Sequence, residues 1–433
     1  MILPKVHEVR LDNGFRALLV ERHNLPVVAS LLVYEVGARD ERTGETGLSH
    51  FLEHMMFKGT ERFGKGMIDL LTAKLGGSNN AFTDNDVTAY HFSLAADRWD
   101  TALEIEANRM RGCLLDEKEF AAEKSVVLEE LAMGEDDPAR MLYQTAESLV
   151  FQVHPYHHPV IGWKEDLQRL DVAGMRAYYE RHYGPNRAFL VAIGDFDLKT
   201  TEARVRELFA GIPPLAQPRA AALQEPQQKG ERRAVVRFPG NIPRLALAAR
   251  SVRVGEADDF PLDLLAFLLG HGKTARLYQR LVLKEQIATD VVVANESRLD
   301  PGVFWILAEL HEDAQPAEAE RMVRAEIERI ALDGVSAADL RRVRTQIRAG
   351  FLFEGETVLD LAVKLGRYEA SAREGYRLLD RVLPAYDAVR PAQVRAVAER
   401  YLAPDSLTAV WSVPESFSLA QGTRRSKAAR ARR

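Results

Sequence analysis

The chain has 433 residues, of which 46% are hydrophobic and 28% are charged, and its formal net charge at pH 7 is −5. This length exceeds what one hydrophobic core organises, so we expect a soluble globular protein with at least two domains. The slightly acidic balance gives no reason to expect a nucleic-acid partner. The longest apolar segments, such as residues 27–36, meet charged residues too soon to span a membrane.

Features at single positions and at the two ends add little about function. The one cysteine, Cys113, cannot form a disulfide within the chain and is predicted to be a buried small residue. No signal peptide is visible, which favours the cytoplasm, or the periplasm if the numbering begins after a removed leader. The basic segment at residues 424–433 is interpreted as a solvated terminus rather than a binding site.

Short alternating runs at residues 15–20, 27–36 and 88–94 predict strands. Most of the remaining length has the periodicity of amphipathic helices. Strands and helices in separate blocks predict an α+β fold, with a mostly antiparallel sheet and helices packed on one face.

The two halves of the chain end in the same way. Residues 176–181 predict a helix that is followed by a Pro-Asn turn and an apolar run; residues 395–400 begin the same pattern about 219 positions later. Asp116 and Ser336, each followed three residues later by an acid, are helix-start signals at a matching offset. We therefore predict two homologous domains, at residues 1–212 and 232–433, joined by a linker at 213–231.

The segment His50-Phe51-Leu52-Glu53-His54 lies in an apolar stretch of helical length. Residues four apart share one helix face, so His50 and His54 can bind the same ion. Glu53 lies close to that ion without having to ligate it. Two imidazoles beside a carboxylate that can take a proton from water are the groups that a zinc hydrolase needs, and this order is the inverzincin motif. The alternative is an ordinary helix that carries two core or surface histidines.

A second helix, beginning at the Asp116 cap, offers a third ligand. Its periodicity puts Glu123 and Glu130 beside the apolar stripe and Glu129 on the opposite face. Buried carboxylates need partners, which Lys or Arg side chains could supply instead of a metal. Together with the histidine pair, the pattern favours Glu130 as the third ligand and Glu123 as an acid outside the ligand set.

The segment from Gly47 to Thr60, GLSHFLEHMMFKGT, resembles the zinc helix of the pitrilysin/insulinase peptidases, which include mitochondrial processing peptidase. The resemblance covers nearly the whole chain. It implies that His50, His54 and Glu130 hold Zn²⁺ and that Glu53 is the general base, with Glu123 as a further acid of the site. Asn80-Ala81-Phe82-Thr83 resembles the family's active-site edge strand, which pairs with the substrate backbone; Asn80, Ala81 and Phe82 are the substrate-binding residues that the resemblance implies.

One departure from the family bears on partners. The resemblance implies that one-chain members have an Arg and, seven residues later, a Tyr in the second half, and that both bind substrate. In this chain the matching positions hold Val282 and Thr289. Arg280 is near, but no Tyr follows it at that spacing. The resemblance therefore implies the zinc-bearing subunit of a heterodimeric processing peptidase, with a homologous metal-free partner that supplies the Arg and Tyr. A homodimer and a non-catalytic scaffold homologue are the alternatives.

Overall fold

The structure is a computed structural model that describes residues 4–217, 219–221 and 223–417. The basic segment at 424–433 lies outside them. The chain forms two compact units, and neither is one continuous half of the sequence. Unit 1 comprises Met1–Met133, Val153–Gln224 and Ala349–Val382; unit 2 comprises Gly134–Gln152, Glu225–Arg348 and Leu383–Arg433.

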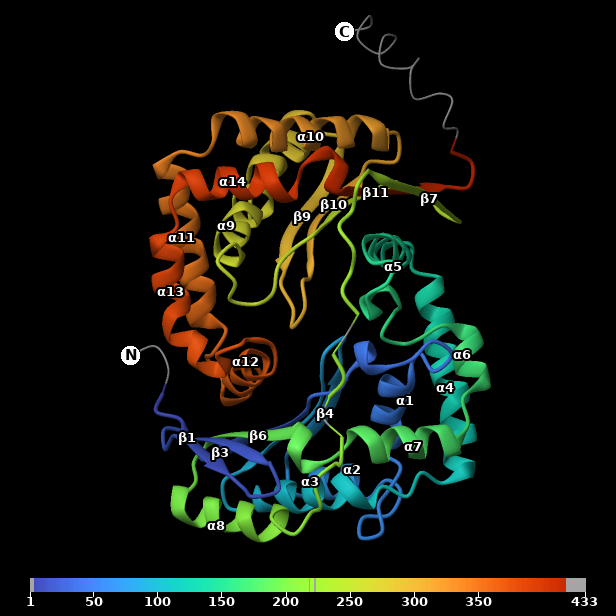
Figure 1. Ribbon diagram of the computed structural model, residues 1–433, viewed down its shortest axis with the longest axis vertical. Helices are drawn as coiled ribbons and strands as arrows, with labels where there is room; N and C mark the ends of the chain where they lie inside the picture. Colours follow the sequence, from blue (N-terminus) through green and yellow to red (C-terminus); the bar gives the residue numbers. More distant parts are fainter. Residues whose placement is uncertain (1–3, 218, 222, 418–433) are drawn as a thin grey trace, which may run out of the picture. The chain divides into compact units, whose positions relative to one another are not determined.

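Unit 1 contains a six-stranded sheet with the order β1-β2-β6-β3-β5-β4 (Figure 1). Only the β2–β6 pair is parallel. The predicted strands are present, and β4 lies at one edge of the sheet. The strands are β1 (His7–Arg10), β2 (Arg16–Glu21), β3 (Val27–Tyr34), β4 (Ser78–Thr83), β5 (Thr88–Ala95) and β6 (Ala188–Gly194).

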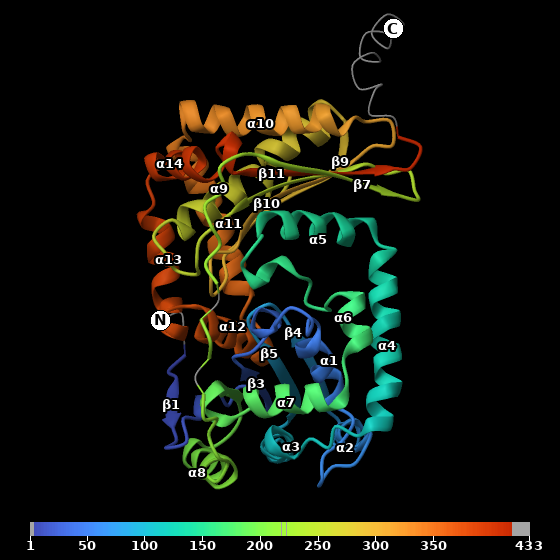
Figure 2. The ribbon, with the colours of Figure 1, turned by 45° about the vertical axis from the view of Figure 1, so that its right-hand side comes forward.

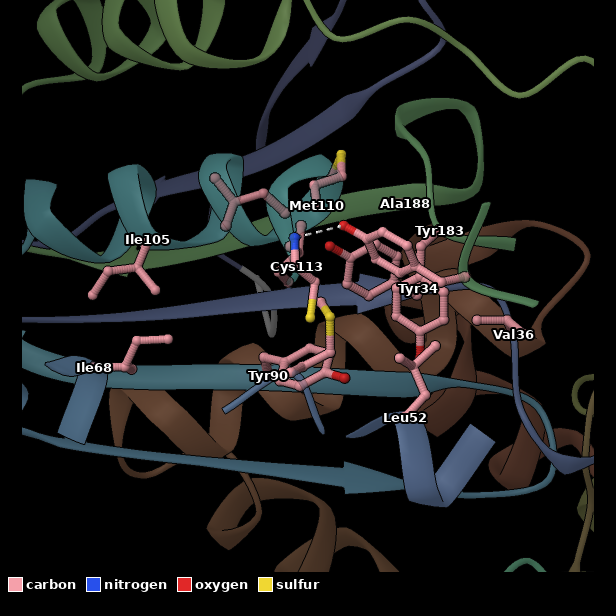
Figure 3. Close-up of a cluster of buried hydrophobic side chains, with 14 of the residues drawn as sticks. Tyr34, Val36, Leu52, Ile68, Tyr90, Ile105, Met110, Cys113, Tyr183 and Ala188 are labelled. Atoms are coloured by element: carbon pink, nitrogen blue, oxygen red, sulfur yellow. Dashed lines mark hydrogen bonds between the residues drawn. The ribbon is translucent and has the colours of Figure 1, made fainter. Parts of the chain in front are cut away.

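The core of unit 1 lies between this sheet and helices from the first half of the chain. Figure 3 shows Leu52, Tyr90 and Met110 meeting there, from a helix, a strand and a second helix. Cys113 is buried in the same cluster, as predicted. The helices of this half in unit 1 are α1 (Leu48–Met55), α2 (Met67–Lys74), α3 (Asp100–Gly112), α6 (Lys164–Arg169), α7 (Val172–His182) and α8 (Leu198–Phe209), together with most of α4 (Glu117–Glu135).

Unit 2 repeats this architecture. Its five-stranded sheet has the order β7-β11-β8-β10-β9, in which only the β7–β11 pair is parallel. The order and directions match those of β2-β6-β3-β5-β4, which confirms the predicted α+β class and the homology of the two sheets. The strands are β7 (Arg232–Phe238), β8 (Arg244–Arg250), β9 (Ala288–Glu296), β10 (Val303–Leu310) and β11 (Leu407–Pro414).

The second half of the chain also contains a set of helices, and one of them begins with the same kind of cap as a helix of the first half. Apart from the helix at Val358–Ser371, which belongs to unit 1, they are α9 (Asp259–Gly270), α10 (Pro316–Asp333), α11 (Ala337–Phe353), α13 (Leu379–Ala388) and α14 (Pro391–Tyr401), with a π-helix at Tyr278–Lys284. Asp116 and Ser336 cap α4 and α11, because their side chains accept backbone N–H bonds from those first turns. No helix of the described residues is long and apolar enough to cross a membrane.

Each unit also contains a helix from the other half of the sequence (Figures 1 and 2). In unit 1, α12 (Val358–Ser371) packs on β3 and β6, where Gly366 meets Leu31 and Val33. Those two side chains point away from the face that α1 and α3 cover, since neighbours in a strand alternate. In unit 2, α5 (Pro138–Val150) packs on β7, β8 and β11. A division of the chain at the predicted linker, residues 213–231, would assign α5 to the first unit and α12 to the second. In the structure each of these two helices belongs to the other unit.

Candidate metal centre

Helix α1 carries the inverted motif, and its sequence fixes which face meets the core. It begins after Gly47, whose φ of 90° is left-handed and where a Cβ would lie 2.4 Å from the carbonyl oxygen of Ile161. Only glycine fits there. Phe51, Leu52 and Met55 are fully buried, which leaves the motif residues half-buried on the other side of the helix.

His50, His54 and Glu130 come together as the sequence predicts. Nε2 of His50 lies 3.7 Å from Oε1 of Glu130, and Nε2 of His54 lies 3.6 Å from its Oε2. Among the described residues, these three form the one group of His, Cys, Asp or Glu side chains whose ligand atoms all lie within 4.8 Å of one another. Glu129, the neighbouring carboxylate, is exposed.

These three side chains fit a zinc ion. Nitrogen and carboxylate ligands that hold zinc at about 2.0–2.1 Å in a tetrahedron lie about 3.3 Å from one another. The separations of 3.6 and 3.7 Å are close to that value. Three protein ligands also leave one position for water or substrate, as in catalytic rather than structural zinc sites.

Glu53 lies beside these three candidate ligands and outside their group. Its Oε2 accepts a hydrogen bond of 2.5 Å from the hydroxyl of Thr83 on β4. Burial raises the pKa of Glu53 above its ordinary value, while the Thr83 hydrogen bond and His54 act in the opposite direction. A raised pKa makes a carboxylate a stronger base, which is the direction that a general base requires.

Glu123 supports His54 from the side opposite the ligand atoms. Its Oε1 lies 2.9 Å from Nδ1 of His54, and its Oε2 lies 2.5 Å from Nζ of Lys58. Burial opposes ionisation of Glu123, but the hydrogen bonds from Lys58 and His54 lower its pKa below the ordinary value. The carboxylate is thus ionised, and it selects the tautomer of His54 whose Nε2 is free for a metal.

A buried carboxylate caps the start of α1. Glu41 accepts the backbone N–H bonds of Gly47 at 2.8 Å and of Ser49 at 2.7 Å. Burial raises the pKa of Glu41 to about 8, although those two N–H donors favour its ionised form. The first N–H groups of a helix have no acceptor within the helix, and the carboxyl group of Glu41 accepts hydrogen bonds from two such groups at the start of α1, close to His50.

The edge strand β4 presents different groups on its two faces. Ala81 and Thr83 point toward α1, as the Thr83–Glu53 bond and the packing of Ala81 on the unit 1 core show. Asn80 and Phe82 lie on the opposite face because side chains alternate along a strand. Of the three predicted substrate-binding residues, only Ala81 therefore shares a face with the metal centre.

The backbone of β4 is also oriented by its pairing. The N–H of Asp84 donates to the carbonyl of Val87 at 2.9 Å in the β4–β5 turn. Hydrogen-bonded and non-hydrogen-bonded pairs alternate in antiparallel strands, so Ala81 and Thr83 turn their N–H and C=O groups toward the free edge. Consistent with this orientation, the Ala81 N–H donates to Oδ1 of Asn80 at 2.9 Å.

The roles of three residues in this centre were not predicted from the sequence. Lys58 follows His54 by four positions but lies beyond the end of α1 at Met55, so helical spacing does not place it. Thr83 is two positions from Ala81, and strand alternation puts both on one face. Glu41 carries no local signal, because it lies six and eight positions before the backbone groups that it binds, across a loop.

In unit 2, Val282 and Thr289 each contact other groups of the same unit. Val282 is half-buried in the π-helix and packs against the unit 2 core. The hydroxyl of Thr289 donates to groups of Glu309, including its backbone carbonyl at 3.3 Å. Arg280 lies 3.9 Å from the carboxylate of Glu326.

Comparisons with known proteins agree with this geometry. Residues 16–163 match the family described as Insulinase (Peptidase family M16), and residues 169–347 match the Peptidase M16 inactive domain. The zinc protease PqqE of Helicobacter pylori is 29% identical over 83% of this chain and 82% of its own length. An uncharacterized zinc protease of Streptomyces coelicolor is 26% identical over 92% of this chain and 87% of its own.

Solved structures give the same result. The crystal structure of a protease from Helicobacter pylori matches with a TM-score of 0.91 and 27% identity, covering 95% of this chain and all of that one. A structure from Pseudomonas fluorescens, described as a peptidase M16 inactive domain, matches with a TM-score of 0.85 and 18% identity, covering 95% of this chain and 98% of that one; it supports the fold alone. Since both family segments, the inverted histidine motif and the paired sheets coincide in one chain, it belongs to the pitrilysin/insulinase family of zinc peptidases, peptidase family M16.

Proposed function

We propose that the protein is a zinc metalloendopeptidase that hydrolyses peptide bonds in unfolded peptides or short proteins. The observation that carries this proposal is the group His50, His54 and Glu130 with Glu53 directly beside it. Non-catalytic relatives used as scaffolds have no need of such a set. The matched inactive domain lies in the second part of the chain, outside α1 and α4.

The chain's own groups account for the proton transfers of such a reaction. When bound, zinc supplies Lewis acidity to a carbonyl group and to water. Glu53 takes the proton of the attacking water and returns it to the leaving amine. Burial of Glu53 keeps its carboxylate poorly solvated, which strengthens it as a base. Glu123 and Lys58 keep His54 in one orientation through this cycle.

The free edge of β4 supports an extended peptide as substrate. Ala81 and Thr83 offer outward N–H and C=O groups, so a peptide can add there as a further strand. Backbone pairing of this kind recognises an unfolded chain with little dependence on its side chains. An unfolded peptide presents an extended backbone along its whole length, which is why we propose unfolded peptides as the substrate class.

The test is hydrolysis of an unstructured peptide that carries a fluorophore and a quencher. We expect zinc-dependent cleavage that a chelator abolishes and that added zinc restores. The matched control is Glu53→Gln with the same zinc content, which should be inactive. A protein that binds no zinc would favour the scaffold alternative.

We further propose that full activity requires a homologous subunit. Val282 and Thr289 stand where one-chain relatives have Arg and Tyr, and Arg280 is engaged by Glu326. Much of the rate of a hydrolase comes from holding the substrate against the reacting groups. A metal-free partner with the same two-domain build and an Arg and Tyr at these positions would supply that hold; a homodimer is the alternative.

Kinetics of the purified chain separate these cases. The chain should be weakly active alone and gain activity when the partner is added. Loss of that gain when the partner's Arg and Tyr are replaced would identify their role. Full activity of the lone chain, with no gain from such a partner, would exclude the heterodimer. Light scattering on the lone chain then distinguishes a homodimer from a monomer.

A further inference from the structure

Thr83 connects the free edge of β4 to the carboxylate of Glu53. We propose that Thr83 is a positioning residue: its hydroxyl orients Glu53 for proton transfer, while its backbone belongs to the edge where the peptide adds. This inference deepens the proposed peptidase function and rests on it. It assigns a role to a residue that lies 30 positions from Glu53 in the sequence.

The hydrogen bond itself is specific. Oγ1 of Thr83 lies 2.5 Å from Oε2 of Glu53 and 3.4 Å from Oγ1 of Thr88. A hydroxyl has one proton, so the much shorter contact takes it. Thr88 donates its own proton to the carbonyl of Val36 at 3.0 Å, which leaves its oxygen without a proton to offer Thr83. Thr83 is therefore the donor and Glu53 the acceptor.

The strand fixes the direction of this donor. Thr83 is β-branched, so few side-chain rotamers are open to it. Its position in the register opposite Thr88 directs the side chain to the face that meets α1. With Oε2 of Glu53 held in this way, Oε1 is the oxygen that remains for the proton of water. Without the hydroxyl, the carboxylate could rotate, and a misplaced base loses rate.

The same residue also belongs to the substrate edge. The N–H and C=O groups of Thr83 face outward in the same way as those of Ala81. A peptide that pairs with these groups therefore contacts the residue whose side chain holds the base. Because removing the hydroxyl leaves this backbone intact, the proposal predicts a loss in kcat with little change in KM.

The experiment compares three variants of the full chain, assayed with zinc and with the partner subunit if one is required. Thr83→Val keeps the shape of the side chain without its hydroxyl, and Thr83→Ser keeps the hydroxyl. Ser78→Ala is the matched control, because Ser78 is exposed on the opposite face of the same strand. Zinc content and the unfolding midpoint are measured for each, so that loss of metal or fold is recognised.

For Thr83→Val we expect kcat to fall roughly ten- to a hundredfold, with KM within about threefold of wild type. Thr83→Ser should recover most of kcat, and Ser78→Ala should resemble wild type. Wild-type kcat in Thr83→Val would overturn the proposal. So would equal losses in the Val and Ser variants, since a side chain that keeps the hydroxyl would then be no better than one that lacks it.

A second readout does not depend on turnover. In the cobalt-substituted protein, the visible absorption bands report the surroundings of the metal, including the position of Glu53. We expect Thr83→Val to alter these bands and Thr83→Ser to restore them. Unchanged bands in Thr83→Val would also overturn the role of Thr83. If the wild-type protein cleaves no peptide, the peptidase proposal fails, and the cobalt spectra still decide whether Thr83 orients Glu53.

Discussion

Nδ1 of His54 lies 2.9 Å from Oε1 of Glu123, while Nε2 of the same ring faces Glu130 at 3.6 Å. One imidazole thus joins two carboxylates that are seven residues apart on α4. The seven-residue spacing brings both carboxylates to one side of the helix, nearly two turns apart. Glu123 and Glu130 consequently have different roles although they have the same chemistry.

Replacement of Glu53 by Gln should abolish peptide hydrolysis and leave zinc bound. The change removes the proton acceptor but no ligand, so we expect the rate to fall about a hundredfold or more. Peptide cleavage and zinc content are measured on the same preparation. The exposed Glu129→Gln is the control and should keep both. Near-normal turnover of a zinc-loaded Glu53→Gln protein would refute the role of Glu53 as the base.

Adjacent glutamates on α4 should differ in zinc binding. Glu130→Ala removes a carboxylate that faces both histidines and should lose zinc, whereas Glu129→Ala alters an exposed side chain and should keep it. Elemental analysis after dialysis gives the two metal contents. Equal zinc in both variants would mean that another carboxylate completes the ligand set.

Glu123→Ala should have an intermediate effect. It removes the acceptor for His54 Nδ1 and the partner of Lys58, but no ligand. We expect zinc to remain bound with an affinity reduced about ten- to a hundredfold, the usual cost of losing support outside the ligand set. Competition with a chelator of known affinity measures this change. An affinity equal to wild type would show that His54 is held by other groups.

The cap on α1 should matter for stability. In Glu41→Ala, the N–H groups of Gly47 and Ser49 lose their buried acceptor, and each such loss costs about 1–3 kcal/mol. We expect a lower unfolding midpoint in urea. The exposed Glu61→Ala serves as the control and should unfold like wild type. An unchanged midpoint in Glu41→Ala would imply that another group caps the helix.

Acid should destabilise the protein through His182. Burial lowers the pKa of this imidazole to about 3, and the charges of Arg181 and Arg187 act in the same direction. Between pH 6.5 and 3 the unfolded chain binds a proton that the folded chain does not. Stability is therefore full above pH 6.5 and is lost as the pH falls, by up to about 1.4 kcal/mol per pH unit.

Unfolding midpoints at several pH values between 7 and 4 test this effect. His182→Gln has no ionisable ring and should show a shallower decline than wild type. The exposed His311→Gln should keep the wild-type slope. Identical slopes for wild type and His182→Gln would assign the acid sensitivity to other groups.

Local spacing was enough to predict much of the centre. His50 and His54 share a face because a helix repeats every 3.6 residues, and the same period separates Glu130 from Glu129. The strands at residues 15–20, 27–36 and 88–94 were predicted by alternation, and they occur as β2, β3 and β5. These features depend on neighbours within a few positions, so the order of residue types encodes them directly.

Long-range packing supplied the rest. Thr83 meets Glu53 only because β4 lies at the edge of the sheet beside α1, and Glu41 reaches α1 only through the fold of its loop. The exchange of α5 and α12 is of the same kind. An apolar stripe shows that a helix must bury one side, yet it does not specify against which sheet the helix packs. Contacts between segments that are distant in the sequence determine which sheet each of these helices covers.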